Sequence, residues 1–171
     1  GSVSADKTMT AFGMTFTITD VVVSEGGTAE FTITGSGTST ENSDKTLTIT
    51  AASGGAAGVN PATSPGDYGN LSLTSATIQK KKAPFKTPNA TSFTVTVPTV
   101  GDTLLEPKED FTVTLAMAGI ADTAVGYASV CNVPSGFSVD DPVAVVDGNN
   151  VIFTVTRAGP TTSAATVQYA T

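Results

Sequence analysis

Short runs in which apolar residues alternate with Thr or Ser recur along this chain of 171 residues. The clearest runs are Thr15–Thr19, Ala29–Thr34, Thr46–Thr50, Phe93–Val97, Phe111–Leu115 and Val151–Thr156. A period of two places the apolar side chains of a strand on one face, and β-branched residues suit such a pleated surface. Segments rich in Gly, Ser and Pro separate the runs, and no stretch has the period of a long helix. The pattern predicts an all-β, antiparallel sandwich or barrel.

The segment that begins at Phe16 occurs a second time, beginning at Phe137. Residues 16–27 followed by Phe31–Gly35 match residues 137–149 followed by Phe153–Arg157. The two copies begin about 120 residues apart, which is the size of a typical domain.

The repeat divides the chain into three parts. We expect a sandwich over residues 14–133 and, over residues 134–171, a linker and the first strands of a second, incomplete copy. Asn132–Gly136 is the expected linker, and Val167–Tyr169 is the expected third strand of the second copy. By the same register, residues 1–13 are expected to be the terminal strand of a preceding repeat or a leader segment.

The order of several motifs resembles the Calx-beta repeat family. These motifs are Val23–Gly26, Phe31–Thr34, Gly66–Tyr68, Phe93–Pro98 and Gly101–Leu115, the last of which is the most specific. The resemblance covers about 120 residues once and the first third of a second copy. It implies an immunoglobulin-like, antiparallel β-sandwich of about seven strands, of the kind found in tandem in bacterial surface proteins and adhesins.

The resemblance also implies a calcium site at one end of the sandwich. The positions that match the family's ligands are Glu25, Asp67, Asp102, Glu106 and Glu109. Ca²⁺ binds six to eight oxygens, and five carboxylates gathered without a cation would repel one another.

The chain departs from the family's ligand pattern at several positions. Gly101 stands in place of one of two paired acids, Lys108 occupies an often acidic position, and Asn132–Pro134 replaces an acidic run. The expected calcium site is therefore weak. The alternative is that Glu25 and Glu109 cap turns while the other carboxylates are solvated.

The sequence gives no support for catalysis. It contains no His, which excludes a Ser-His-Asp or Cys-His arrangement and a His-based zinc site. Cys131 is the single cysteine, so no intramolecular disulfide forms, and Val130 and Asn132 beside it are not basic. We expect that the chain is not an enzyme.

Charge and hydropathy exclude two classes of partner. The net charge of −7 and a pI of about 4.3 disfavour nucleic acid, which requires a basic surface. No stretch of about 20 apolar residues is present that could insert into a membrane. The acidic, Thr-rich and Cys-poor composition, with the resemblance, favours a secreted or cell-surface protein of a bacterium.

We expect a structural repeat that acts as a spacer or assembly module. Its partners would be neighbouring repeats of the same protein, with head-to-tail self-association by strand completion. The alternative is an adhesive module that binds a glycan or protein through the long loop at residues 53–70 and a basic cluster formed by Lys80–Lys82 with Lys86. A solvated hairpin loop is the simpler interpretation of the basic cluster.

Overall fold

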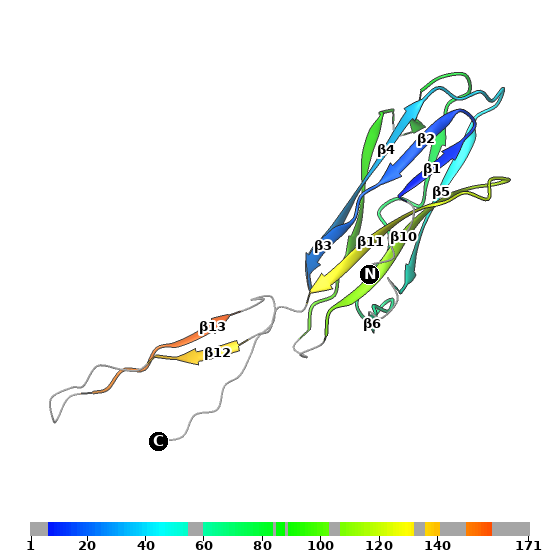
Figure 1. The fold of residues 1–171 in the computed structure, drawn as a ribbon. Helices are drawn as coiled ribbons and strands as arrows, with labels where there is room; N and C mark the ends of the chain where they lie inside the picture. Colours follow the sequence, from blue (N-terminus) through cyan, green and yellow to red (C-terminus); the bar gives the residue numbers. More distant parts are fainter. Residues whose placement is uncertain are drawn as a thin grey trace.

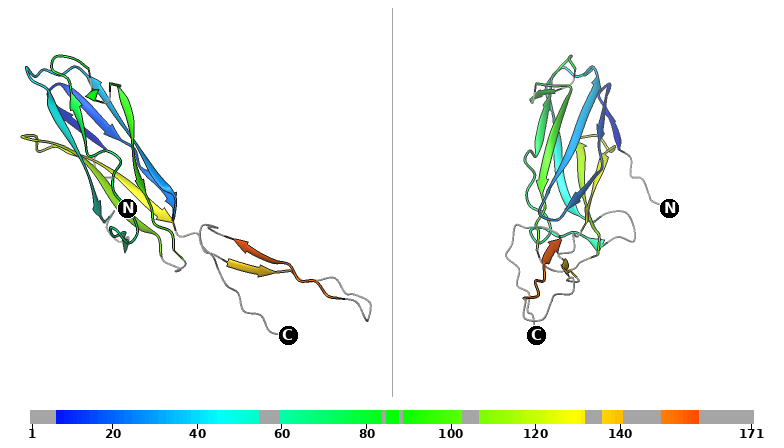
Figure 2. Two further views of the ribbon diagram at one scale, coloured as in Figure 1. Left: turned by 180° about the vertical axis from the view of Figure 1, so that it is seen from behind. Right: turned by 90° about the vertical axis from the view of Figure 1, so that its left-hand side faces the viewer.

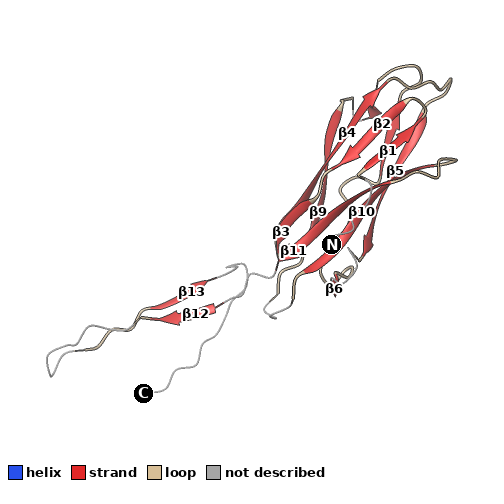
Figure 3. Ribbon diagram, in the orientation of Figure 1, coloured by secondary structure: helices blue, strands red, loops and turns tan. Residues whose placement is uncertain are grey.

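The computed structural model describes residues 7–54, 60–83, 85–87, 89–102, 107–131, 136–140 and 150–158. These residues form strands and loops, and the predicted all-β sandwich is confirmed (Figures 1 and 3). No helix within these ranges is long and apolar enough to cross a membrane. The strands are β1 (Thr8–Ala11), β2 (Met14–Ile18), β3 (Val21–Ser24), β4 (Thr28–Gly37), β5 (Lys45–Ser53), β6 (Asn60–Pro61), β7 (Ser75–Ile78), β8 (Phe85–Thr87), β9 (Ser92–Pro98), β10 (Glu109–Met117), β11 (Ala124–Cys131), β12 (Gly136–Val139) and β13 (Val155–Ala158).

Two sheets face each other in the sandwich, as the views in Figure 2 show. Sheet A has the strand order β1-β2-β4-β9, and sheet B has the order β3-β11-β10-β5-β7-β8, with β6 beside β10. All neighbours are antiparallel except β3 with β11 and β6 with β10, which are parallel. The sheets contain more strands than the seven expected because short strands, such as β1, β6 and β8, join the long ones.

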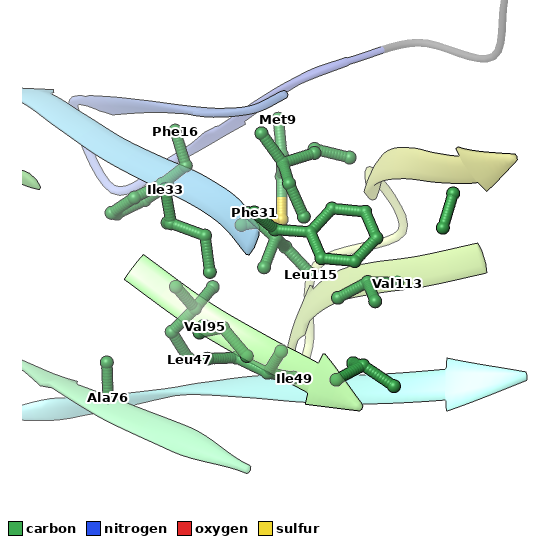
Figure 4. Close-up of a cluster of buried hydrophobic side chains, with 14 of the residues drawn as sticks. Met9, Phe16, Phe31, Ile33, Leu47, Ile49, Ala76, Val95, Val113 and Leu115 are labelled. Atoms are coloured by element: carbon green, nitrogen blue, oxygen red, sulfur yellow. The ribbon is translucent and has the colours of Figure 1, made fainter. Parts of the chain in front are cut away.

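The core fills the space between the two sheets (Figure 4). Phe16, Phe31 and Ile33 of sheet A and Leu47 and Leu115 of sheet B are completely buried there. Each comes from a run with period two, so the intervening Thr residues face outward. Removal of this apolar surface from water is the main force that holds the sheets together.

The chain passes from one sheet to the other between β2 and β3. β2 pairs with β4 in sheet A, whereas β3 pairs with β11 in sheet B. Asp20, at the crossing, accepts a hydrogen bond from the backbone N–H of Tyr127 over 3.0 Å and forms an ion pair with Lys7. The N-terminal part of the chain therefore contributes β1 and β2 to sheet A and β3 to sheet B.

Four of the six predicted runs lie within β4, β5, β9 and β10, and a fifth, Thr15–Thr19, matches β2 except for its last residue. The sixth prediction, Val151–Thr156, is wrong for its first four residues, because β13 begins at Val155. In the first copy the equivalent residues, Ala29–Thr32, pair with β9. The described part of the second copy offers residues 151–154 no such neighbour.

The strand β1 belongs to the sandwich of this chain, although the repeat register set residues 1–13 apart from it. β1 pairs with β2 through a tight turn at Phe12 and Gly13, whose φ angles are 54° and 79°. Met9 is completely buried and Ala11 is 3% exposed. Residues 1–6 lie outside the described residues, as do Val167–Tyr169 and most of the expected linker.

The packing of β1 predicts that Met9→Ala lowers the free energy of unfolding by about 2–5 kcal/mol, because it leaves a cavity in the core. Thr10→Ala, at the exposed neighbouring position, is the matched control and should change it by less than about 0.5 kcal/mol. Urea denaturation followed by circular dichroism measures both values. Equal, small effects would mean that β1 is not part of the folded unit.

Candidate functional site

Four of the five predicted calcium ligands lie at one end of the sandwich. Glu25 follows β3, Asp67 lies in the segment before β7, Asp102 follows β9, and Glu109 begins β10. Glu106 lies outside the described residues.

Backbone hydrogen bonds and one close contact tie this end together. Glu25 N–H donates to Cys131 C=O over 3.1 Å, and Val100 N–H donates to Asp67 C=O over 2.9 Å. A Cβ added at Gly101 would lie 3.0 Å from Gly26 Cα, so the loops after β3 and β9 are in close contact. The fold therefore gathers the segments that carry these acids.

The side chains at this end do not form a ready-made metal site among the described residues. Asp67 Oδ2 accepts hydrogen bonds from the N–H and the Oγ1 of Thr63, over 2.5 Å and 2.8 Å. Asp67 therefore closes a turn within its own loop, a role that the alternative interpretation gave to Glu25 and Glu109. Within the described ranges, no three Asp, Glu, Cys or His side chains are grouped closely enough to hold an ion.

Asp110 is a buried acid that the sequence did not reveal. Its side chain is 5% exposed, its Oδ1 has no hydrogen-bond partner among the described residues, and Lys108 Nζ lies 3.9 Å from it. Alternation with the core residue Phe111 predicts an outward, solvated position for Asp110. β6 lies beside it, pairing Pro61 with Asp110, and Ala62 N–H donates to its C=O over 2.9 Å. No signal in the sequence predicts that a distant two-residue strand lies beside this position.

The basic cluster is paired with its own chain. Lys80–Lys82 lie in the turn between β7 and β8, and Lys86 lies in β8. Lys86 Nζ contacts Asp44 Oδ2 at 2.7 Å, Lys80 N–H donates to Asp44 Oδ1 over 3.0 Å, and Lys81 Nζ donates to Thr40 C=O over 2.6 Å. These contacts hold the turn against the loop before β5.

The hairpin of β12 and β13 repeats the pairing of β2 and β4 residue by residue. Ile18 pairs with Ile33 in the first copy, and Val139 pairs with Val155 in the second. Phe16 pairs with Gly35, and its counterpart Phe137 pairs with Arg157.

The polar contacts at the end of the pair are repeated as well. Thr19 N–H donates to Thr32 C=O over 3.2 Å, while Thr19 Oγ1 accepts from Thr32 N–H over 2.9 Å. In the second copy, Asp140 N–H donates to Thr154 C=O over 3.1 Å, and Asp140 Oδ1 accepts from Thr154 N–H over 2.6 Å. The repeat found in the sequence is therefore also a repeat of backbone geometry.

The hairpin differs from the first copy in burial. Phe16 and Ile18 are 0% and 2% exposed, whereas Phe137 and Val139 are 41% and 58% exposed. Figures 1 and 2 show the hairpin apart from both sheets of the sandwich. We call the apolar side chains of Phe137, Val139, Phe153 and Val155 the hairpin face. It is an apolar surface of the kind that marks an interaction site.

The contacts of Asp44 predict a pH-dependent contribution to stability. The hydrogen bond from Lys86 is the main cause that lowers the pKa of Asp44 below its ordinary value of 3.8, and the N–H of Lys80 adds to it. A carboxyl with a lowered folded-state pKa stabilises the fold above its unfolded pKa, and the stabilisation is lost as the pH falls through the folded value.

We therefore expect Asp44→Asn to reduce the midpoint of thermal unfolding at pH 7 and to have no such effect once the pH is well below 3.8. Because Asp44 lies at the surface, the reduction at pH 7 should be small and should shrink in high salt. Melts of both proteins across this pH range measure it. A difference between the proteins that does not change with pH would contradict the ion pair.

Comparison with known proteins adds no family to these observations. No protein-family model matches the chain, and no curated protein matches it. The resemblance to the Calx-beta repeat therefore depends on the motifs quoted above and stays a prediction.

Proposed function

We propose that this chain is a non-catalytic structural repeat of a secreted or cell-surface bacterial protein, acting as a spacer or assembly module. The observation that carries the proposal is the hairpin of β12 and β13, which repeats the register of β2 and β4. A module that begins a second time after one sandwich is typical of a tandem array, in which each repeat packs against its neighbours.

The partner of the hairpin face is a neighbouring repeat of the same kind. In the first copy, sheet B covers the equivalent residues, Phe16, Ile18, Phe31 and Ile33. A two-stranded hairpin is marginally stable in water, and a second sheet is needed to bury its apolar side. The sheet of an adjacent copy that is equivalent to sheet B would meet this requirement.

Self-association should therefore depend on the hairpin face. We expect the average mass of the full chain, measured by sedimentation equilibrium, to rise with concentration across the micromolar range. Phe137→Ser combined with Phe153→Ser should abolish the rise, because burial of the two rings would no longer drive association. Because this contact joins two different surfaces of the chain, each added copy leaves a free surface for the next, and we expect oligomers of several sizes.

The matched control for this experiment is Thr94→Ser, at an exposed position of β9 in sheet A. It should associate as the unchanged chain does. Association that survives loss of both Phe rings, or a mass that stays monomeric at every concentration, would contradict assembly through the hairpin face.

Weak calcium binding at the acidic end is the second part of the proposal. Glu25, Asp102 and Glu109 are the ligands that we propose, and they lie on segments joined by the backbone contacts described above. Asp67 would add an oxygen only after release of Thr63. Because of this competition we expect an affinity at the weak end of the range for extracellular calcium modules, about 1 mM.

At 10 mM Ca²⁺, such a site should stabilise the fold by about 1.4 kcal/mol through mass action. Urea denaturation with 10 mM CaCl₂ and with EDTA measures the difference, and 10 mM MgCl₂ controls for ionic strength. Glu109→Gln should remove the response, whereas Glu41→Gln, in the loop between β4 and β5 at the opposite end of the sandwich, should keep it. Equal stability with calcium and with EDTA would remove calcium from the proposal and leave the repeat function standing.

A further inference from the structure

The strand β5 has an edge that its neighbour covers for only half of its length. β7 pairs with β5 over Lys45–Thr48, and one further hydrogen bond joins Ile49 N–H to Thr74 C=O over 2.8 Å. Alternate N–H groups of a strand point to the same edge. The N–H groups of Ala51 and Ser53 therefore point to the side of β7, and among the described residues they have no backbone partner.

The uncovered edge exists because the chain before β7 leaves sheet B and runs along sheet A. Ser72 N–H donates to Thr96 C=O, Gly69 N–H donates to Pro98 C=O, and Tyr68 pairs with Thr99. These bonds hold residues 68–72 against β9, so they cannot continue the line of β7 beside β5. A gap remains beside β5 where β7 would otherwise extend.

This gap is an open groove with a volume of about 540 Å³. The buried side chains of Ile49 and Tyr68 line it together with the exposed Thr48, Thr50 and Asn70. The volume lies within the range of sites that bind small ligands and short peptide segments. None of the residues that line the groove is charged.

The chemistry of the groove selects an extended peptide. Free N–H and C=O groups at a strand edge are satisfied by another extended backbone, as in β-augmentation. The uncharged lining offers no partner to a charged side chain, whose burial would be costly. Tyr68 is 4% exposed, and its ring stacks on Phe111 at 4.4 Å, so it gives a sugar no open aromatic face.

The chain's own hairpin is a poorer match to this groove. In the first copy, one edge of β4 pairs with β2 and the other edge pairs with β9. Val151–Val155 is the equivalent segment of the second copy, and the edge that faces away from β12 is the equivalent of the edge that β9 covers. The expected partner of that edge is therefore the second copy's equivalent of β9. That segment also carries three large, exposed apolar residues, Val151, Ile152 and Phe153, whereas exposed polar residues such as Thr48, Thr50 and Asn70 line the groove.

We propose that the groove beside Thr48–Ala51 binds an extended, uncharged peptide segment of another protein, which pairs with the open edge of β5 in the place that β7 vacates. This site would make the chain an adhesive module, the alternative function considered above, with a peptide and not a glycan as the ligand. It does not depend on assembly through the hairpin face. The segment would carry small apolar side chains toward Ile49 and Tyr68 and polar ones toward solvent.

The test uses the full chain carrying Phe137→Ser and Phe153→Ser, so that assembly does not interfere. The probe is the blocked peptide Thr-Val-Thr-Val-Thr. Titration followed by ¹H–¹⁵N NMR should shift the amide signals of Ala51 and Ser53 and slow their exchange with solvent. Two control peptides carry N-methyl groups on alternate residues, one peptide on the odd-numbered and the other on the even-numbered positions. In one of them the methyl groups replace the N–H groups that face β5, so this peptide should bind about fivefold or more weakly.

Two protein variants separate strand pairing from nonspecific contact. Ala51→Pro removes the N–H that faces the groove and leaves the bonds of β5 to β10 in place, so it should fold and bind at least about fivefold more weakly. Asn70→Trp should block the groove even if Ala51→Pro fails to fold, while Thr94→Trp on β9 is the size-matched control and should bind normally.

Three results would overturn the proposal. The first is that millimolar peptide leaves the Ala51 and Ser53 signals in place. The second is that Asn70→Trp binds as well as Thr94→Trp. The third is that these signals move with protein concentration alone, which would assign the groove to a second copy of the chain. None of these results bears on the role of the hairpin face, which the sedimentation experiment tests separately.

Discussion

The crossing of the chain between β2 and β3 is the contact on which both sheets depend. Thr19 passes so close to β11 that a Cβ at Gly126 would lie 2.6 Å from its carbonyl oxygen. Asp20 then accepts the N–H of Tyr127, which fixes β3 in register beside β11. Because one short segment is hydrogen-bonded into both layers, the sheets cannot slide past one another without breaking ladder bonds on both sides. The facing positions of the core residues follow from this constraint.

The same crossing assembles the acidic end of the molecule. β3 and β11 are parallel, so their ends coincide and Glu25 bonds to the carbonyl of Cys131. Gly26 then lies against Gly101 in the loop after β9, which brings the loops of both sheets together. The backbone thereby gathers the segments that carry the acids, while the side chain of Asp67 is already engaged in a turn with Thr63. Acid-bearing segments at the same end of the sandwich therefore do not by themselves form a cation site.

The hairpin of β12 and β13 separates the local part of this fold from the tertiary part. Its register and its Asp140–Thr154 bonds match those of β2 and β4, although no second sheet covers it within the part of the chain that the structure describes. Strand register in this repeat is thus set by pairing and by the polar residue at the end of the strand. Burial of Phe137 and Val139 requires a second layer, which two strands cannot supply.

The sequence by itself determined where β2, β4, β5, β9 and β10 lie and where the repeat begins, because alternation and self-similarity are local properties of the chain. Alternation left both a sandwich and a barrel open, and it did not single out β11. The motif order also predicted that Glu25, Asp67, Asp102 and Glu109 lie at one end. Only the tertiary structure decided that Met9 belongs to this core, that Asp110 is buried beside β6, and that β5 has an open edge. Each of these depends on which distant segment lies against a strand, and a period of two says which residues share a face but not what covers it.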